Sequence, residues 1–154
     1  MSKIAVFPGS FDPITLGHVN IIERALPLFD KIIIAIGTNS QKQSYFTLEQ
    51  RINWLQEIYL TEKKVEIQSY EGLTIDFCSA QNAEYILRGL RNAGDYEYEQ
   101  AIAQTNKMLN NNIETVFMLR APEFAHISST IVKEVLRHNG NIDKMVPLVV
   151  TRGA

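Results

Sequence analysis

The chain has 154 residues, with 15 lysines and arginines against 17 aspartates and glutamates, so its formal net charge is −2 at pH 7. This charge provides no positive field for a nucleic-acid backbone, and we expect no nucleic-acid partner. The 45% hydrophobic and 21% charged residues are typical of a globular domain. A chain of this length buries about 70% of the surface that its unfolded form exposes. We therefore expect one domain over residues 1–154.

Membrane spans, export signals and disulfides are not expected. The longest apolar run covers residues 32–36, whereas a membrane-spanning helix needs about 20 apolar residues. The first residues are polar and lead into a predicted strand, without the apolar core of a signal peptide. The one cysteine, Cys78, excludes an intramolecular disulfide and a cysteine-based zinc site. We expect a cytoplasmic protein with no membrane partner.

Short apolar segments predict strands, and helical patterns separate them. The predicted strands cover residues 4–7, 32–36, 65–68, 85–87 and 115–119. The predicted helices cover residues 19–28, 47–58, 73–81 and 95–109, and a last helix begins near Ser128. Thr47 and Gln50 have the spacing of a capping box, which supports a helix start there. The alternation predicts an α/β domain with a doubly wound parallel sheet.

The loop after the first predicted strand carries the strongest functional signal. Residues 8–13 are rich in proline and glycine, and they lead to Gly17 and His18 in the first turn of the next helix. A helix N-terminus has free N–H groups and a partial positive charge, which suit a phosphate. The sequence contains neither of the two common glycine-rich phosphate loops. We interpret His18 as a directed hydrogen-bond donor to a nucleotide phosphate.

Two further loops fall at the same predicted edge of the sheet, where open α/β folds bind ligands. Arg88 and Arg91 follow the fourth predicted strand. They suit a phosphate-binding site, because one guanidinium group can donate two parallel hydrogen bonds to the oxygens of a phosphate. Residues 128–130 follow the fifth strand and predict a helix N-cap that also suits a phosphate. Lys133, one turn later, is placed to reach the same anion.

Several other polar residues have ordinary structural interpretations. Asp12 precedes a proline, where turn aspartates are usually structural. Lys42 and Glu99 are by default a surface lysine and a solvated helical carboxylate. His138 is near a helix end and is interpreted as complementing the helix dipole. His126 precedes residues 128–130 and is not a catalytic candidate.

Four motifs in order resemble those of a known enzyme family. Residues 9–13 followed by 15–18 resemble the T/H-x-G-H signature of the nucleotidyltransferase superfamily, and residues 127–130 resemble its I-S-S-[ST] signature. Residues 87–91 and 95–99 lie between them. This set is similar, along nearly the whole chain, to the bacterial phosphopantetheine adenylyltransferase family. The resemblance implies a Rossmann-like nucleotidyltransferase fold.

The resemblance also implies roles for individual residues. His18 would be the catalytic residue, a transition-state stabiliser that donates a hydrogen bond to the α-phosphate of ATP. The implied ATP-binding residues are Ser10, Phe11, His18, Gly89, Leu90, Arg91, Glu99, Phe124, Ala125, His126, Ile127, Ser128, Ser129 and Thr130. The implied acceptor-binding residues are Ser10, Lys42, Thr74 and Arg88. Mg²⁺ is expected on the triphosphate, held by phosphates and water, with no metal ligand from the protein.

By this resemblance the chain would move AMP from ATP to 4′-phosphopantetheine, giving dephospho-coenzyme A and pyrophosphate. A homohexamer and feedback inhibition by coenzyme A are also implied. Two alternatives stay open: a different phosphorylated acceptor, such as nicotinate mononucleotide or glycerol 3-phosphate, and a nucleotide-binding regulator without catalysis. The sequence departs from the family at Ser10, where relatives often have threonine, and at residues 124–126. Residues 149–154 are expected to lack the family's final helix.

Overall fold

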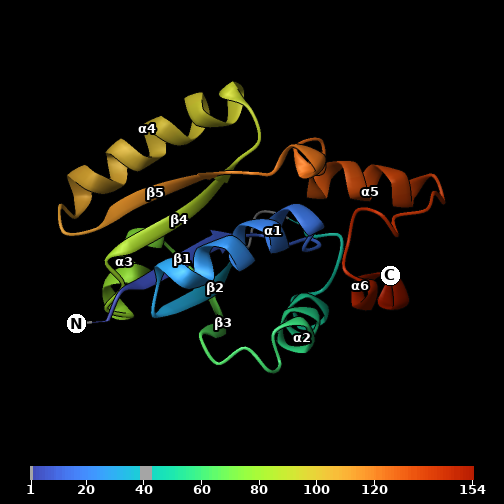
Figure 1. Cartoon of the computed structure of the whole chain (residues 1–154), viewed down its shortest axis with the longest axis horizontal. Coiled ribbons are helices and arrows are strands. Elements are labelled where there is room, and N and C mark those ends of the chain that lie inside the picture. The colour runs from blue at the N-terminus through green and yellow to red at the C-terminus, as the bar shows by residue number, and fades with distance from the viewer. Residues whose placement is uncertain (1, 39–42) are drawn as a thin grey trace.

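The computed structural model describes residues 2–38 and 43–154. Its strands confirm the predicted ones, each extended by one to three residues: β1 (Ile4–Gly9), β2 (Lys31–Gly37), β3 (Val65–Tyr70), β4 (Tyr85–Leu90) and β5 (Glu114–Leu119). They form one five-stranded parallel sheet in the order β3-β2-β1-β4-β5. The predicted α/β fold with a doubly wound parallel sheet is confirmed (Figure 1).

Helices follow the strands in the predicted order, but the first begins at Leu16 rather than at residue 19 and ends at Ala25 rather than at residue 28, and the last was not predicted. They are α1 (Leu16–Ala25), α2 (Leu48–Ile58), α3 (Thr74–Ala80), α4 (Ala93–Leu109), α5 (Ser129–Arg137) and α6 (Leu148–Gly153), with single 3₁₀ turns at Leu26–Leu28 and Pro122–Phe124. The capping box of Thr47 and Gln50 is confirmed at the start of α2. Within the described residues, no helix combines the length and apolar character needed to span a membrane.

The prediction that residues 149–154 lack a helix is wrong, because α6 covers most of this segment. The helix is too short to be stable alone, so packing must stabilise it. Val150 is fully buried in the core, and Gly153 lies against Trp54 of α2, where a Cβ would come within 2.8 Å of the indole nitrogen. Tertiary contacts of this kind leave no local pattern in a short sequence.

Both faces of the sheet are covered. Side chains of β1 and β2 that include Phe7 and Ile34 pack with α1, α2, α5 and α6, whereas Val6 and Ile33 pack with α3 on the other face. The α4 helix lies against β4 and β5 (Figure 1). Cys78 and Trp54 are buried in these cores. Each buried isoleucine contributes about 1.5–3 kcal/mol to folding.

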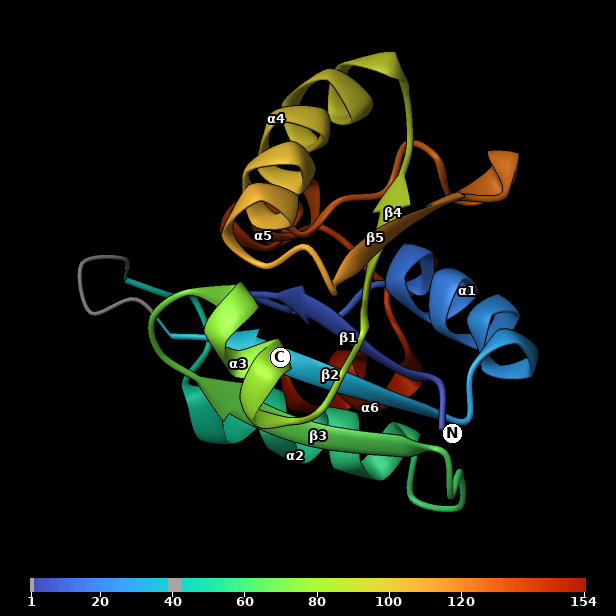
Figure 2. The same ribbon diagram turned by 90° about the vertical axis from the view of Figure 1, so that its left-hand side faces the viewer.

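The pairing between β1 and β4 is unusually short. Only Ala5 pairs with Tyr85 and Val6 with Ile86, whereas the other neighbouring strands pair over six residues. Figure 2 shows β4 and β5 rising steeply away from β1, β2 and β3. The strand order also reverses between β1 and β4, and such switch points create ligand-binding crevices at the carboxyl ends of the strands.

Candidate active site

Two cavities lie at the carboxyl ends of the strands. Cavity A, of about 380 Å³, is lined by the β1–α1 turn, the β4–α4 segment and the start of α5. Cavity B, of about 360 Å³, is lined by the ends of β1, β2 and β3 and by one side of α4. Both cavities share Pro8, Gly9, Ser10, Arg88 and Glu99 in their linings. A ligand in cavity A and a ligand in cavity B would therefore meet at these residues.

His18 lines cavity A and is fixed by a capping box at the start of α1. The backbone N–H of Thr15 donates to His18 Nδ1 over 2.9 Å, and the hydroxyl of Thr15 accepts from the backbone N–H of His18. Glutamate or glutamine usually fills the position that the imidazole takes here. Phe11 supports the ring from the side, with centroids 5.0 Å apart. The imidazole is thus held in one orientation before any ligand binds.

The environment of His18 keeps its imidazole neutral. Burial is the largest cause that lowers the pKa of His18 from 6.5 to about 3, and nearby guanidinium groups add to it: Arg120, Arg88 and Arg91. Because Nδ1 accepts the N–H of Thr15, the single proton of the neutral ring lies on Nε2. His18 is therefore a neutral hydrogen-bond donor rather than a general acid or base.

We expect the His18 imidazole to stay neutral as the free protein is acidified from about pH 8 to about pH 5, because its lowered pKa places protonation below that range. The measurement is a titration of the ring nitrogens by NMR, with the His18→Gln variant used to assign the resonances. The spectrum should show the Nε2–H tautomer at every pH in that range. A titration midpoint near 6.5 would contradict this prediction.

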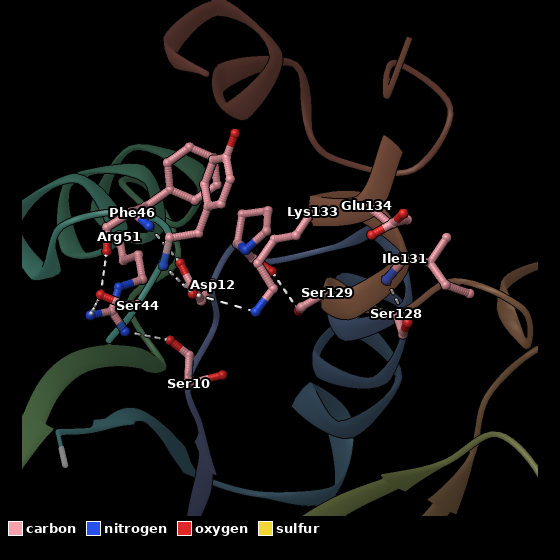
Figure 3. A network of polar contacts seen from close by, with 12 residues as sticks. Ser10, Asp12, Ser44, Phe46, Arg51, Ser128, Ser129, Ile131, Lys133 and Glu134 are labelled. Atoms are coloured by element: carbon pink, nitrogen blue, oxygen red, sulfur yellow. Dashed lines mark hydrogen bonds and ion pairs between the residues drawn. The ribbon is translucent and has the colours of Figure 1, made fainter. Parts of the chain in front are cut away.

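Asp12 organises the turn that leads to His18 (Figure 3). Its carboxylate accepts the backbone N–H groups of Tyr45 and Phe46, each over 2.8 Å, and forms an ion pair with Lys133 at 3.5 Å. These contacts confirm the structural interpretation of Asp12. They also pair Lys133 with Asp12, and Lys133 does not line cavity A, so its reaching the same anion as residues 128–130 stays a prediction.

Arg88 bridges the separated ends of β1 and β4. Its Nη1 donates to the carbonyl of Pro8 over 2.6 Å, and its Nε and Nη2 form a paired interaction with Glu99 of α4, at 3.0 and 2.6 Å. Glu99 is only 8% exposed, so the interpretation of Glu99 as a solvated carboxylate is wrong. The salt bridge fixes the guanidinium at the boundary of the two cavities.

Arg91 lies farther along the same segment and lines only cavity A. Its Nε and Nη2 donate to the carboxylate of Asp95 over 2.9 and 3.0 Å. This hydrogen-bonded pair raises the pKa of Arg91 and lowers the pKa of Asp95. Both predicted arginines are thus held by carboxylates of α4, one at the boundary with cavity B and one inside cavity A.

The start of α5 forms the opposite wall of cavity A. Ser128 is the N-cap residue, as predicted, and its hydroxyl accepts the N–H of Ile131 over 3.1 Å. Ser129 donates from its hydroxyl to the carbonyl of Pro13, which ties α5 to the β1–α1 turn. Thr130 is exposed and lines the cavity. The N-termini of α1 and α5 therefore border one cavity.

Arg120, which the sequence analysis did not single out, also lines cavity A. It follows β5, and its Nη1 donates to the carbonyl of Ile127. A Cβ at Gly17 would lie within 3 Å of three guanidinium atoms of Arg120, so any other residue at position 17 would force this guanidinium to shift. One feature of the sequence could have identified Arg120 as a site residue: it directly follows a predicted strand, at the same sheet edge as Arg88.

Apart from Thr74, which lines cavity B, the structure places the predicted residues in three groups. Those that line cavity A are Ser10, Phe11, His18, Arg88, Gly89, Arg91, Glu99, Ser128, Ser129 and Thr130. Those that line neither cavity are Leu90, Phe124, Ala125, His126 and Ile127. Ile127 is buried and His126 is exposed. Lys42 lies outside the described residues.

Cavity B is lined by both polar and apolar groups. Thr74 lines it, and its hydroxyl lies 2.7 Å from the hydroxyl of Tyr70. Ile102 and Asn106 line it from α4. Among residues 2–38 and 43–154, no group of three or more histidine, cysteine, aspartate or glutamate side chains is placed to hold a metal ion.

Cavity A can bind a polyanion, because two helix N-termini, a fixed imidazole donor and arginines converge there. No hydroxyl or thiol that lines it is paired with a general base within the described residues. His18 uses Nδ1 to accept the N–H of Thr15. This arrangement suits group transfer by positioning and charge stabilisation rather than by a protein nucleophile.

Known proteins resemble this chain in sequence and in structure. The cytidylyltransferase-like family model matches residues 6–135. A phosphopantetheine adenylyltransferase from Christiangramia forsetii is 57% identical over 150 residues, which cover 97% of this chain and 99% of that protein. One from Flavobacterium johnsoniae is 55% identical over 143 residues, or 93% of each chain.

A crystal structure assigned to a nicotinate-nucleotide adenylyltransferase from Vibrio parahaemolyticus has the same fold. It superposes with a TM-score of 0.71 at 19% identity, and the match covers 99% of this chain and 97% of that one. The family that the four motifs predicted is confirmed by the similar sequences, and the fold by the superposition. This chain belongs to the phosphopantetheine adenylyltransferase family, within the cytidylyltransferase-like nucleotidyltransferases.

Proposed function

We propose that this chain transfers the AMP group of ATP to 4′-phosphopantetheine, giving dephospho-coenzyme A and pyrophosphate. The observation that carries the proposal is the shared boundary of the two cavities, formed by residues of the β1 end together with Arg88 and Glu99. ATP would occupy cavity A, and the acceptor would occupy cavity B. Membership of the family supplies the identity of the acceptor.

The reaction is an in-line displacement at the α-phosphorus of ATP. An oxygen of the acceptor phosphate forms a bond to that phosphorus, and the bond to the β-phosphate oxygen breaks, releasing pyrophosphate. The second pKa of a phosphomonoester is about 6, so the nucleophile is already ionised at neutral pH and needs no general base. Catalysis then depends on bringing two anions together and on stabilising the charge that develops.

The roles of the side chains follow from where each is held. His18 donates from Nε2 to an oxygen of the α-phosphate, and it does so as a neutral group. Arg88, at the cavity boundary, binds the acceptor phosphate, and Arg91 binds the phosphates of ATP. The free N–H groups at the start of α5 receive the polyphosphate.

Mg²⁺ belongs to the proposal as the ion that neutralises part of the triphosphate charge. The carboxylates that line cavity A, Asp95 and Glu99, are each paired with an arginine. The carboxylate of Asp12 is occupied by two backbone N–H groups and Lys133. The ion would therefore be held mainly by phosphate oxygens and water rather than by these carboxylates.

A homohexamer, inhibition by coenzyme A and a cytoplasmic location are parts of the proposal that rest on the family resemblance. Exposed apolar side chains on α4 support an assembly of copies, among them Tyr98 and Met108, which are 71% and 79% exposed. Coenzyme A contains both the pantetheine arm and the adenosine group of the proposed product. It therefore suits the same pair of cavities.

We expect 4′-phosphopantetheine to support rapid pyrophosphate release with ATP and Mg²⁺, because the lining of cavity B includes Arg88 and Thr74 together with apolar side chains. Nicotinate mononucleotide and glycerol 3-phosphate serve as matched alternative acceptors, and the measurement follows pyrophosphate. Equal or faster turnover with either alternative would overturn the choice of acceptor. ATP binding without turnover of any acceptor would instead support a regulator.

A further inference from the structure

Arg120 combines partial burial with many unused hydrogen-bond donors. Among the described residues its guanidinium makes one hydrogen bond, from Nη1 to the carbonyl of Ile127, and its buried Nε has no partner. The backbone N–H of Arg120 donates to the carbonyl of Leu90 over 2.9 Å, which fixes the residue at the end of β5. A buried donor without a partner costs free energy, and a bound ligand would remove that cost.

The charge balance of cavity A singles out the same residue. Arg88 is neutralised by Glu99 and Arg91 by Asp95. No carboxylate lies within ion-pair distance of Arg120 in the described parts of the chain. Burial, together with the charge of Arg91, lowers the pKa of Arg120. Asp95 acts on this charge from a distance but is itself paired with Arg91, so Arg120 supplies a positive charge without an ion-pair partner among the described residues.

The position of Arg120 within the site indicates which part of a ligand it meets. It lines cavity A together with Arg91 and the start of α5, and it does not line cavity B. The boundary with cavity B is formed by Arg88 and the β1 end, where the acceptor phosphate would attack. In an in-line displacement the leaving group lies opposite the nucleophile. The proposed function assigns Arg91 and the start of α5 to the polyphosphate, so Arg120 lies beside the groups that would meet the leaving group.

We propose that Arg120 is a further ligand-binding residue, which holds the β- and γ-phosphates of ATP and the pyrophosphate that leaves. This inference rests on the proposed function for the assignment of cavity A to ATP. The guanidinium would donate from Nε and Nη2 to phosphate oxygens, as arginine commonly does. Gly17 keeps the space in which the guanidinium is held.

The test compares ligand affinities of Arg120→Gln and the wild-type protein by calorimetry, without any acceptor. The variant should bind ATP and pyrophosphate at least about tenfold more weakly, the effect of one lost hydrogen bond to a charged group. Its affinity for AMP should change less than about twofold. Arg24→Gln is the matched control, because the guanidinium of Arg24 likewise donates to a backbone carbonyl, that of Leu119 in β5, but Arg24 lines neither cavity.

Equal losses for AMP and ATP would overturn the proposal and place Arg120 on the nucleoside. Unchanged affinities for all three ligands would show that Arg120 is only structural. If Arg120→Gln does not fold, Arg120→Lys replaces it in the test, because lysine keeps the charge but loses the paired donors. This variant should also lose affinity for ATP and pyrophosphate more than for AMP, by a smaller factor. Because no acceptor is present, a wrong acceptor would leave the result intact, whereas a wild-type protein that does not bind ATP would refute the proposed function itself.

Discussion

Replacing His18 by alanine is expected to lower kcat about 10²–10³-fold, which is the typical effect of removing one donor that stabilises a transition state. The dissociation constant of ATP should change little, because the Nε2–H group acts on charge that develops during the reaction. The measurements are kcat by pyrophosphate release and ATP affinity by calorimetry. A near-normal kcat would show that His18 only caps α1, and the proposed mechanism would fail.

His18→Gln separates the chemical role from the capping role. Glutamine is a normal partner in a capping box, so it can accept the N–H of Thr15 and keep the start of α1 intact. It also offers an amide N–H, so a partial recovery of kcat relative to alanine is expected. Thermal unfolding of both variants measures the capping contribution, which is about 1 kcal/mol for the loss of a cap.

Replacing Arg88 by alanine should affect both activity and stability. Loss of a charged hydrogen-bonding partner should raise the KM for the acceptor about 10–100-fold. The variant should also lose about 2–3 kcal/mol of folding free energy, because Glu99 would remain buried and unpaired. The measurements are steady-state kinetics for each substrate and urea unfolding of the free protein. Wild-type constants for both substrates would show that Arg88 does not bind phosphate.

The double variant Arg88→Ala with Glu99→Gln is the control for the stability effect. Removing the unpaired charge should recover much of the folding free energy while the defect in acceptor use persists.

Arg91→Ala offers a matched comparison. The side chain of Asp95 is 21% exposed and that of Glu99 10% exposed, so Arg91→Ala should lose less folding free energy than Arg88→Ala. Its kinetic defect should concern ATP, because Arg91 lines only cavity A.

The sequence predicted the frame of this site well because its signals are local. The apolar runs and helical periodicities identified the strands and most helices, and the glycine- and proline-rich turn before His18 identified a helix N-terminus at the correct sheet edge. The proximity of Arg88 to residues 128–130 followed from the rule that parallel strands align their carboxyl ends. The family resemblance added the chemistry.

Contacts between distant residues could not be predicted in the same way. Arg88 and Glu99 are eleven positions apart and on different elements, so nothing local showed that they form a buried pair. Arg120 meets Gly17 only because α1 and the end of β5 come together in the fold. The bond from Thr15 to His18 had a usable signal in its three-residue spacing, but a histidine in the place of glutamate or glutamine obscured it.

The short pairing of β1 with β4 has a thermodynamic consequence. His18 belongs to the part of the sheet that contains β1, and Arg91 and Arg120 belong to the part that contains β4 and β5. A ligand that contacts both the β1 part and the β4–β5 part connects two regions that few backbone hydrogen bonds join. At a free concentration of 100 times its Kd, such a ligand stabilises the folded state by about 2.7 kcal/mol. Bound substrates therefore hold the two parts of the sheet together, and the free energy of unfolding is highest when the site is filled.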